Sequence, residues 1–73
     1  MIQQFGAKLR ILRKRQVLTL RELAAALGYA GTGYLSDIEF GKKYPTADLI
    51  LKVSRYFGVP MDQLAKDELD LDG

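Results

Sequence analysis

The sequence predicts an all-α protein, a compact bundle of five short helices, and three observations lead to this fold class. Apolar residues recur with helical rather than alternating spacing along nearly the whole chain. Glycine or proline interrupts this pattern at short intervals, so each helix is short. The 73 residues make one domain with a single small core, which leaves no room for a sheet beside five helices.

The first two helices are predicted from apolar spacing and from a capping pattern. An amphipathic helix is expected over about residues 2–15. Thr19 and Glu22 have the spacing of a capping box, in which each side chain accepts a hydrogen bond from the backbone amide of the other. The second helix, LRELAAAL, therefore follows Thr19 and ends at Gly28.

Three further helices follow at the same short spacing. The third is expected over about residues 32–40 with Gly41 after its end, and Thr46 begins a fourth helix that Gly58 ends. Pro60 stands in the first turn of the fifth helix, where its missing amide costs nothing. The residues expected to face the core are Phe5, Leu9, Leu12, Leu23, Ala24, Leu27, Leu35, Ile38, Leu49, Val53, Phe57, Met61, Leu64 and Ala65.

The composition narrows the classes of function. With no cysteine and no histidine, the chain lacks a disulfide framework, the usual zinc ligands and the commonest general base. Carboxylate catalysis remains formally open, but we expect no enzyme, no metal and no cofactor. No apolar run approaches the roughly 20 residues that span a bilayer. Lys8 and Arg10 interrupt the N-terminal apolar residues, unlike in a signal peptide, so we expect a cytoplasmic, nucleoid-associated protein.

The net charge of +2 hides an asymmetry along the chain. Residues 1–43 hold eight basic and three acidic side chains, whereas residues 44–73 hold three basic and six acidic ones. This is the footprint expected of a nucleic-acid binder, although ordinary solvated helix faces would give the same count. We expect residues 1–66 to form the domain and residues 67–73 to form an acidic, frayed C-terminal tail.

Residues 28–43, GYAGTGYLSDIEFGKK, place three glycines before a helical pattern. A P-loop would need lysine and a hydroxyl residue after its second glycine, but Tyr34 and Leu35 stand there. The dinucleotide-binding pattern G-x-G-x-x-G is also absent, so we exclude nucleotide binding. The glycines either make a flexible turn or let a helix approach a large partner. With Lys42 and Lys43 following, we favour double-stranded DNA as that partner.

Two short helices joined by a tight turn, the second flanked by basic residues, make a helix-turn-helix, whose second helix enters the DNA major groove. Three stretches follow one another at matching spacing: FGAKLRILRKRQVLTLRELAAALG, YLSDIEFGKKYPT and LILKVSRYFGVPMDQL. Together they resemble the phage-repressor and Cro family of helix-turn-helix domains, also called the Xre family. The likeness covers residues 5–66, nearly the entire chain.

The resemblance implies roles for individual residues. Arg13 and Glu39 would form an ion pair that ties the first helix to the end of the third. Asp37 would either accept from a cytosine amino group or remain solvated. The residues implied in base readout are Thr32, Gly33, Ser36 and Asp37. The family positions that touch phosphates are Tyr34, Lys42 and Lys43, with Arg10, Lys14, Arg15 and Arg21 as weaker candidates.

Three positions depart from the family pattern. Leu20 replaces a glutamine that usually grips a phosphate, and the turn between Gly28 and Tyr34 is one residue longer than the common form. Both departures weaken the expected phosphate contact. Val17 stands where glycine is frequent, so we expect the first helix to end by a different route.

The predicted function is a sequence-specific DNA-binding transcriptional regulator, a repressor, that binds an imperfect palindrome as a homodimer. The alternative is a protein-interaction module of the same fold, antitoxin-like or adaptor-like, with a regulatory protein partner and weak or no DNA binding. Leu20, Gly33 and Asp37 favour it, because each removes a DNA contact. The dimer-interface candidates are Val59, Met61, Leu64, Leu69 and Leu71. Leu69 and Leu71 would equally suit the monomer core or a disordered tail.

Overall fold

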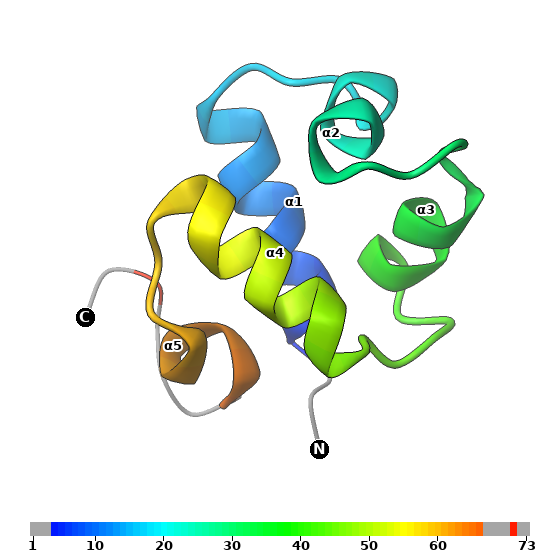
Figure 1. Cartoon of the computed structure of the whole chain (residues 1–73). Helices are drawn as coiled ribbons and strands as arrows, with labels where there is room; N and C mark the ends of the chain where they lie inside the picture. The colour runs from blue at the N-terminus through cyan, green and yellow to red at the C-terminus, as the bar shows by residue number, and fades with distance from the viewer. Residues whose placement is uncertain (1–3, 67–70, 72–73) are drawn as a thin grey trace.

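The computed structural model describes residues 4–66 and residue 71, and all regular structure in this part of the chain is helical (Figure 1). The all-α class and the order of five helices predicted from the sequence are confirmed. None of the described helices combines the length and hydrophobicity needed to cross a bilayer. The helices are α1 (Phe5–Arg15), α2 (Leu20–Leu27), α3 (Gly33–Glu39), α4 (Ala47–Phe57) and α5 (Met61–Ala65).

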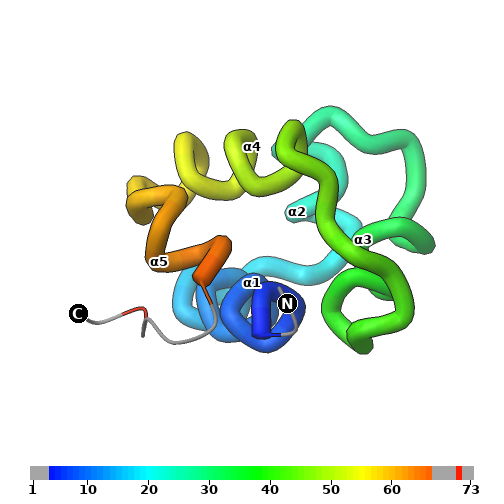
Figure 2. Tube along the Cα trace, turned by 90° about the horizontal axis from the view of Figure 1, so that it is seen from below, coloured from blue at the N-terminus to red at the C-terminus, as the bar shows by residue number. Residues whose placement is uncertain are grey.

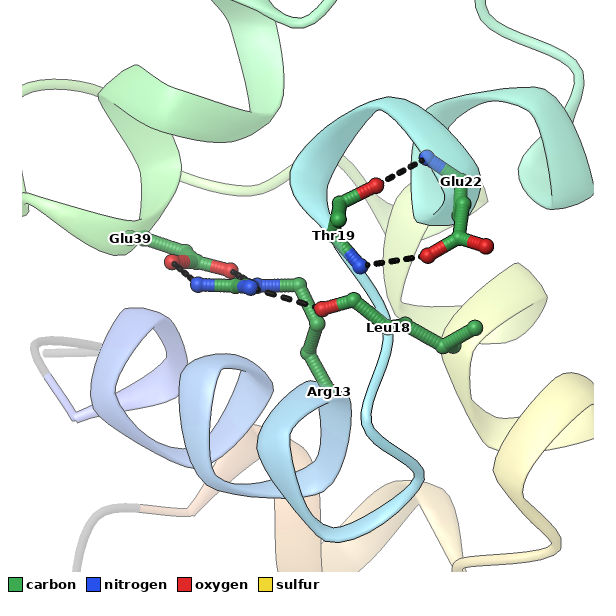
Figure 3. A network of polar contacts seen from close by, with 5 residues as sticks. All are labelled: Arg13, Leu18, Thr19, Glu22 and Glu39. Carbon is green, nitrogen blue, oxygen red and sulfur yellow. Dashed lines mark hydrogen bonds and ion pairs between the residues drawn. The ribbon is translucent and has the colours of Figure 1, made fainter.

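Short-range capping signals set most of the helix boundaries. The Thr19 hydroxyl accepts from the amide of Glu22 at 3.1 Å, and the Glu22 carboxylate accepts from the amide of Thr19 at 2.9 Å, so the predicted capping box is present (Figure 3). Thr46 caps α4 by accepting from the amide of Leu49 at 3.1 Å. Pro60 is the residue before α5 rather than a member of its first turn. The glycines that follow α2, α3 and α4 have positive φ angles: Gly28 (86°), Gly41 (75°) and Gly58 (69°).

The end of α1 uses the same left-handed geometry without glycine. Val17 has a φ of 55° and is 86% exposed. The amide of Leu18 donates to the carbonyl of Arg13, and the amide of Val17 donates to the carbonyl of Lys14, each at 3.0 Å. This double pattern is the Schellman motif, in which a β-branched residue is strained. The expectation that the first helix ends by a different route is therefore wrong.

Helices α1 and α4 occupy opposite sides of the molecule, with α3 at one end and α5 at the other (Figure 2). α2 contacts both α3 and α4. Burial of each leucine or phenylalanine contributes roughly 2 kcal/mol. The buried apolar residues come from all five helices: Phe5, Leu9, Leu12, Leu23, Ala24, Leu27, Leu35, Ile38, Leu49, Ile50, Val53 and Leu64.

Two helices differ from the predicted core assignment. Met61 was expected to face the core but is 39% exposed, because α5 is a single five-residue turn from which only Leu64 is buried. Phe57 and Ala65 are half-buried against the core. Ile50 is buried although it was not predicted, since α4 packs against both α2 and α5 and its buried stripe is wide.

Lys8 is charged and yet buried, with 5% of the residue exposed. Its ammonium donates to the backbone carbonyl of Gln63 and, at 2.8 Å, to that of Lys66. These carbonyls lie in the last turn of α5 and just after it, where helical partners run out. Lys8 therefore ties α1 to α5, and this cation of the basic half of the chain faces inward.

Candidate nucleic-acid interface

Helix α3 lies at one end of the molecule, joined to α2 by residues 28–32 (Figures 1 and 2). Its inner side is apolar, because Leu35 and Ile38 have 0% and 1% exposure. α3 contacts α1 and α2 through this side. Two consecutive helices with a short connection, the second held by one face only, are the structural basis of a helix-turn-helix.

The side of α3 opposite Leu35 and Ile38 faces away from the core. At 3.6 residues per turn it carries an outward row of Gly33, Ser36, Asp37 and Phe40. Three of the four residues predicted for base readout lie in this row, and the fourth, Thr32, immediately precedes α3.

Phe40 was not among the predicted site residues, yet it is 70% exposed. The helical period that defines the outward row would have found it, since Phe40 lies four residues after Ser36 and keeps a right-handed helical backbone.

The N-terminal end of α3 is bare. A methyl group added at Gly31 or Gly33 would have no heavy atom within 4 Å. Neither glycine has a positive φ, so neither crowding nor backbone geometry within the described chain requires glycine there. Thr32, between them, makes no side-chain capping bond to α3. The reason for such small residues therefore does not lie in the fold of this part of the chain.

The C-terminal end of α3 is fixed by an ion pair. Nε of Arg13 donates to one carboxylate oxygen of Glu39 at 2.8 Å, and Nη2 donates to the other at 3.2 Å. Nη1 donates to the carbonyl of Leu18 at 2.8 Å (Figure 3). The two charged side chains are 14% and 5% exposed, and the hydrogen bond to Glu39 raises the pKa of Arg13. The pair implied by the resemblance is present, and Arg13 thereby joins α1 to α3 and to the segment that leads into α2.

Gly6 fixes the same end of α3 by close approach. A Cβ atom at Gly6 would lie 2.1 Å from the carbonyl oxygen of Ile38 and 3.1 Å from Cα of Glu39. Only glycine lets the backbones of α1 and α3 meet at this distance. Sequence reasoning missed Gly6, and the available signal was an isolated glycine inside a predicted helix, which destabilises the helix unless packing needs it.

Comparison with known proteins agrees with this geometry. The chain matches the model of a protein family described as helix-turn-helix over residues 9–64, which include α2 and α3. The chain belongs to this helix-turn-helix family, of the Xre type. A relative from Vibrio cholerae, described as the cryptic phage CTXphi transcriptional repressor RstR, is 32% identical over 63 residues. That alignment covers 86% of this chain and 56% of the relative, so the chain spans about half of the relative's length. No solved structure matches the chain significantly.

Family membership confirms the predicted resemblance and the predicted class. Xre-type helix-turn-helix proteins are DNA-binding regulators of transcription, and the family is not one of enzymes. In this helix-turn-helix, α2 is the bracing helix and α3 the second helix.

Two exposed lysines follow the second helix of the helix-turn-helix. Lys43 pairs with Asp37, with 3.5 Å between Nζ and the carboxylate oxygen, and its Nζ lies 6.0 Å from the ring centroid of Tyr34. Lys42 has no ion-pair partner among the described residues. A hollow of about 320 Å³ adjoins both lysines and is lined by Gly6, Ile38 and residues 41–45. The helix-turn-helix thus presents two cations beside α3, and within the described chain Lys43 is paired and Lys42 is not.

Tyr34 does not suit the phosphate contact that the resemblance implied. Its hydroxyl is buried and has no hydrogen-bond partner among the described residues, so a phosphate cannot reach it in this conformation. The Tyr34 ring packs against that of Tyr29 with centroids 5.4 Å apart. Nζ of Lys52 lies 4.6 Å from the ring centroid of Tyr29. Burial raises the pKa of the Tyr29 hydroxyl. The side chain of Tyr34 is a packing element of the turn.

The predicted cationic contacts on α1 and α2 lie in different surroundings. Arg21 lines a hollow of about 360 Å³ between α2 and the turn, together with Gly31 and Thr32. Arg10 is exposed on α1 and does not line this hollow. Leu20 is half-buried against the core, which explains why an apolar residue replaces the family's glutamine there.

The five dimer-interface candidates differ in their surroundings. Leu64 is fully buried in the core of the single chain, so its assignment to a dimer surface is wrong for this conformation. Met61 is exposed, while Val59 and Leu71 are half-buried against the core. Leu69 lies outside the described residues, as does the predicted acidic tail apart from Leu71.

Proposed function

We propose that this chain is a transcriptional repressor that binds operator DNA by inserting α3 into the major groove. The observation that carries the proposal is the asymmetry of α3, whose C-terminal end is locked by Arg13–Glu39 and whose N-terminal end has no fold-imposed need for glycine. A rigidly held helix with a bare leading end fits a groove about 12 Å wide. The similarity to a phage transcriptional repressor supports this choice.

Sequence readout comes from the outward row and Thr32. Thr32 and Ser36 carry hydroxyls that bond several base edges, and Asp37 accepts from the amino group of cytosine. Gly33 contributes no side chain and admits the backbone to the groove. Phe40 adds an apolar contact, for which the methyl group of thymine is the partner that the major groove offers.

Affinity comes chiefly from the phosphate backbone. Lys42 and Lys43 bind phosphates beside α3, and Arg21 binds one at the hollow next to the turn. Each such contact releases about one counterion, so binding weakens as salt rises. Arg10 is a peripheral contact on α1.

The operator is an imperfect palindrome bound by a homodimer. Two copies of α3 then enter successive major grooves about 34 Å apart. The residues proposed for the interface are Met61, Val59 and Leu71, together with Leu69, which lies outside the described residues.

One observation favours a second function, a protein-interaction module of the same fold. Asp37 places a carboxylate in the outward row, where it repels phosphates unless it finds a donor. Such a module would bind a regulatory protein through α3 and would leave duplex DNA unbound.

Selection of bound sequences from random duplex DNA, followed by a salt titration on the selected duplex, tests the proposal. We expect an enriched palindromic sequence and a log–log salt dependence that falls by about two when Lys42 and Lys43 are both replaced by alanine. Arg55→Ala is the matched control, because it removes an exposed cation on α4, outside the face formed by α3. The proposal is wrong if nothing is enriched, or if the double replacement and the control change the slope equally.

A further inference from the structure

The two neighbouring lysines after α3 differ in whether a carboxylate pairs with them, and the proposed function does not depend on this difference. Nζ of Lys43 is 3.5 Å from the carboxylate of Asp37, whereas Lys42 is unpaired within the described chain. The side chains of Lys43 and Asp37 are 57% and 35% exposed. An ion pair this exposed is weak, so a phosphate or a base edge can replace either partner.

On DNA the two partners of this pair have different targets. Lys43 would go to a phosphate, and Asp37 would go to a base amino group in the groove. If Lys43 leaves while no amino group is present, the Asp37 carboxylate remains unpaired next to phosphates and partly removed from water. That arrangement is unfavourable both by repulsion and by desolvation. If Asp37 finds an amino group, Lys43 is released at no such penalty.

We propose that the Asp37–Lys43 pair couples base readout to phosphate binding, so that Lys43 contacts a phosphate only on DNA that presents a cytosine amino group to Asp37. This proposal rests on the proposed function and deepens it by naming a residue pair that sets specificity. On other sequences Lys43 stays with Asp37 and contributes no counterion release. The protein then discriminates between sequences in two ways. On the correct sequence Lys43 gains a phosphate contact, and on other sequences an unpaired Asp37 would repel the phosphates.

Lys42 supplies the contrast within the same loop. It is adjacent to Lys43 and exposed, and no described carboxylate holds it. It therefore contacts phosphates on any duplex. The two lysines should behave alike on the selected operator and differently on a scrambled duplex.

The test measures salt slopes of the full chain by fluorescence anisotropy on the selected duplex and on a scrambled duplex of equal length. We expect Lys43→Ala to lower the slope by about one on the selected duplex and to leave it unchanged on the scrambled duplex, whereas Lys42→Ala lowers it by about one on both. In an Asp37→Asn background, Lys43→Ala should lower both slopes. Asp37→Asn alone should also tighten binding to the scrambled duplex several-fold.

The outcomes separate this inference from the function on which it rests. Equal effects of Lys43→Ala on the two duplexes, in the presence of Asp37, would overturn the coupling while leaving DNA binding intact. A wild-type chain that selects no duplex would overturn both. Thermal melting checks that each variant is folded. We expect it to be, because the side chains of Lys43 and Asp37 are 57% and 35% exposed.

Discussion

The two ends of α3 are built in opposite ways. At the C-terminal end, Glu39 is held by two hydrogen bonds from Arg13, and the backbone at Ile38 lies against Gly6 so closely that no methyl group fits between them. At the N-terminal end, Gly31 and Gly33 have empty space where a side chain would begin. Glycine occurs at both ends for different reasons: at Gly6 the fold itself demands it, and at Gly31 and Gly33 it does not.

This difference teaches how a short helix can be both rigid and accessible. A seven-residue helix is not stable alone, so α3 depends on packing and on the fixation of one end. The contacts that hold α3 are at its inner face and its C-terminal end, so its N-terminal end remains accessible to a partner. Substitutions at the two ends should therefore separate stability from binding.

Glu39→Ala should have the largest effect on stability. Among the described residues, it leaves the Arg13 guanidinium, whose side chain is 14% exposed, with only the Leu18 carbonyl as a partner. Loss of one member of a buried pair lowers the free energy of unfolding by about 3 kcal/mol. Urea denaturation measures the loss, and DNA affinity should fall with it because α3 is no longer held at a fixed angle. Glu39→Gln, which keeps the shape and one acceptor, should lose less; an unchanged unfolding midpoint for Glu39→Ala would contradict the locked end.

Gly6→Ala should come next. The new methyl group meets the backbone carbonyl of Ile38, which cannot rotate away as a side chain can. Overpacking of this kind lowers the free energy of unfolding by about 2 kcal/mol, although alanine is the better helix former. Thermal or urea denaturation checks it, with Gly31→Ala as the control at an open position. A Gly6→Ala variant as stable as that control would show that α1 and α3 do not approach closely in solution.

Val17→Gly should raise stability and so strengthen the locked end. Val17 has a φ of 55° and lies between Arg13 and Leu18, which are joined by the Arg13 side chain. A β-branched residue is strained in this left-handed conformation, and its exposed side chain makes little packing to lose. We expect a gain of about 1 kcal/mol in the free energy of unfolding. Val17→Ala, which keeps a Cβ atom, should gain less than glycine; the reverse order would mean that the strain is absent.

Gly33→Ala should have the smallest effect on stability and a distinct effect on binding. No heavy atom lies within 4 Å of the new methyl group, and alanine favours a helix, so stability should not fall. If DNA approaches this end closely, affinity for the selected duplex should nevertheless drop. Anisotropy titration measures the affinity for the selected duplex, and a melting curve measures the stability, so the two effects can be separated. Unchanged affinity would mean that the bare end is only a turn.

Local signals in the sequence predicted most of the fold. The capping box at Thr19, the cap at Thr46 and the glycines after α2, α3 and α4 depend on neighbours within a few residues, so their spacing in the sequence reveals them. Val17 shows the limit of that approach, because α1 ends in a left-handed residue although the glycine that favours this conformation is absent.

The parts of the site that depend on contacts between helices were harder to predict. The pair between Arg13 and Glu39, 26 residues apart, came from family resemblance and not from residue spacing. The close approach at Gly6 and the buried hydroxyl of Tyr34 were missed because both depend on how one segment packs against another. The charge count of residues 1–43 included Lys8 as a cation that could bind DNA. The structure shows instead that its ammonium donates to the carbonyls of Gln63 and Lys66, in and just after α5.

The inward-facing ammonium of Lys8 has an experimental consequence. Amine-acylating reagents attack accessible lysines, and Lys42 and Lys43 are open to them, whereas Lys8 is shielded for as long as its two carbonyl acceptors stay in place. The labelling rate at Lys8, set against the other lysines of the same molecule, therefore reports whether the last helix is docked. Read by mass spectrometry, this native reporter follows detachment of that segment without an added probe.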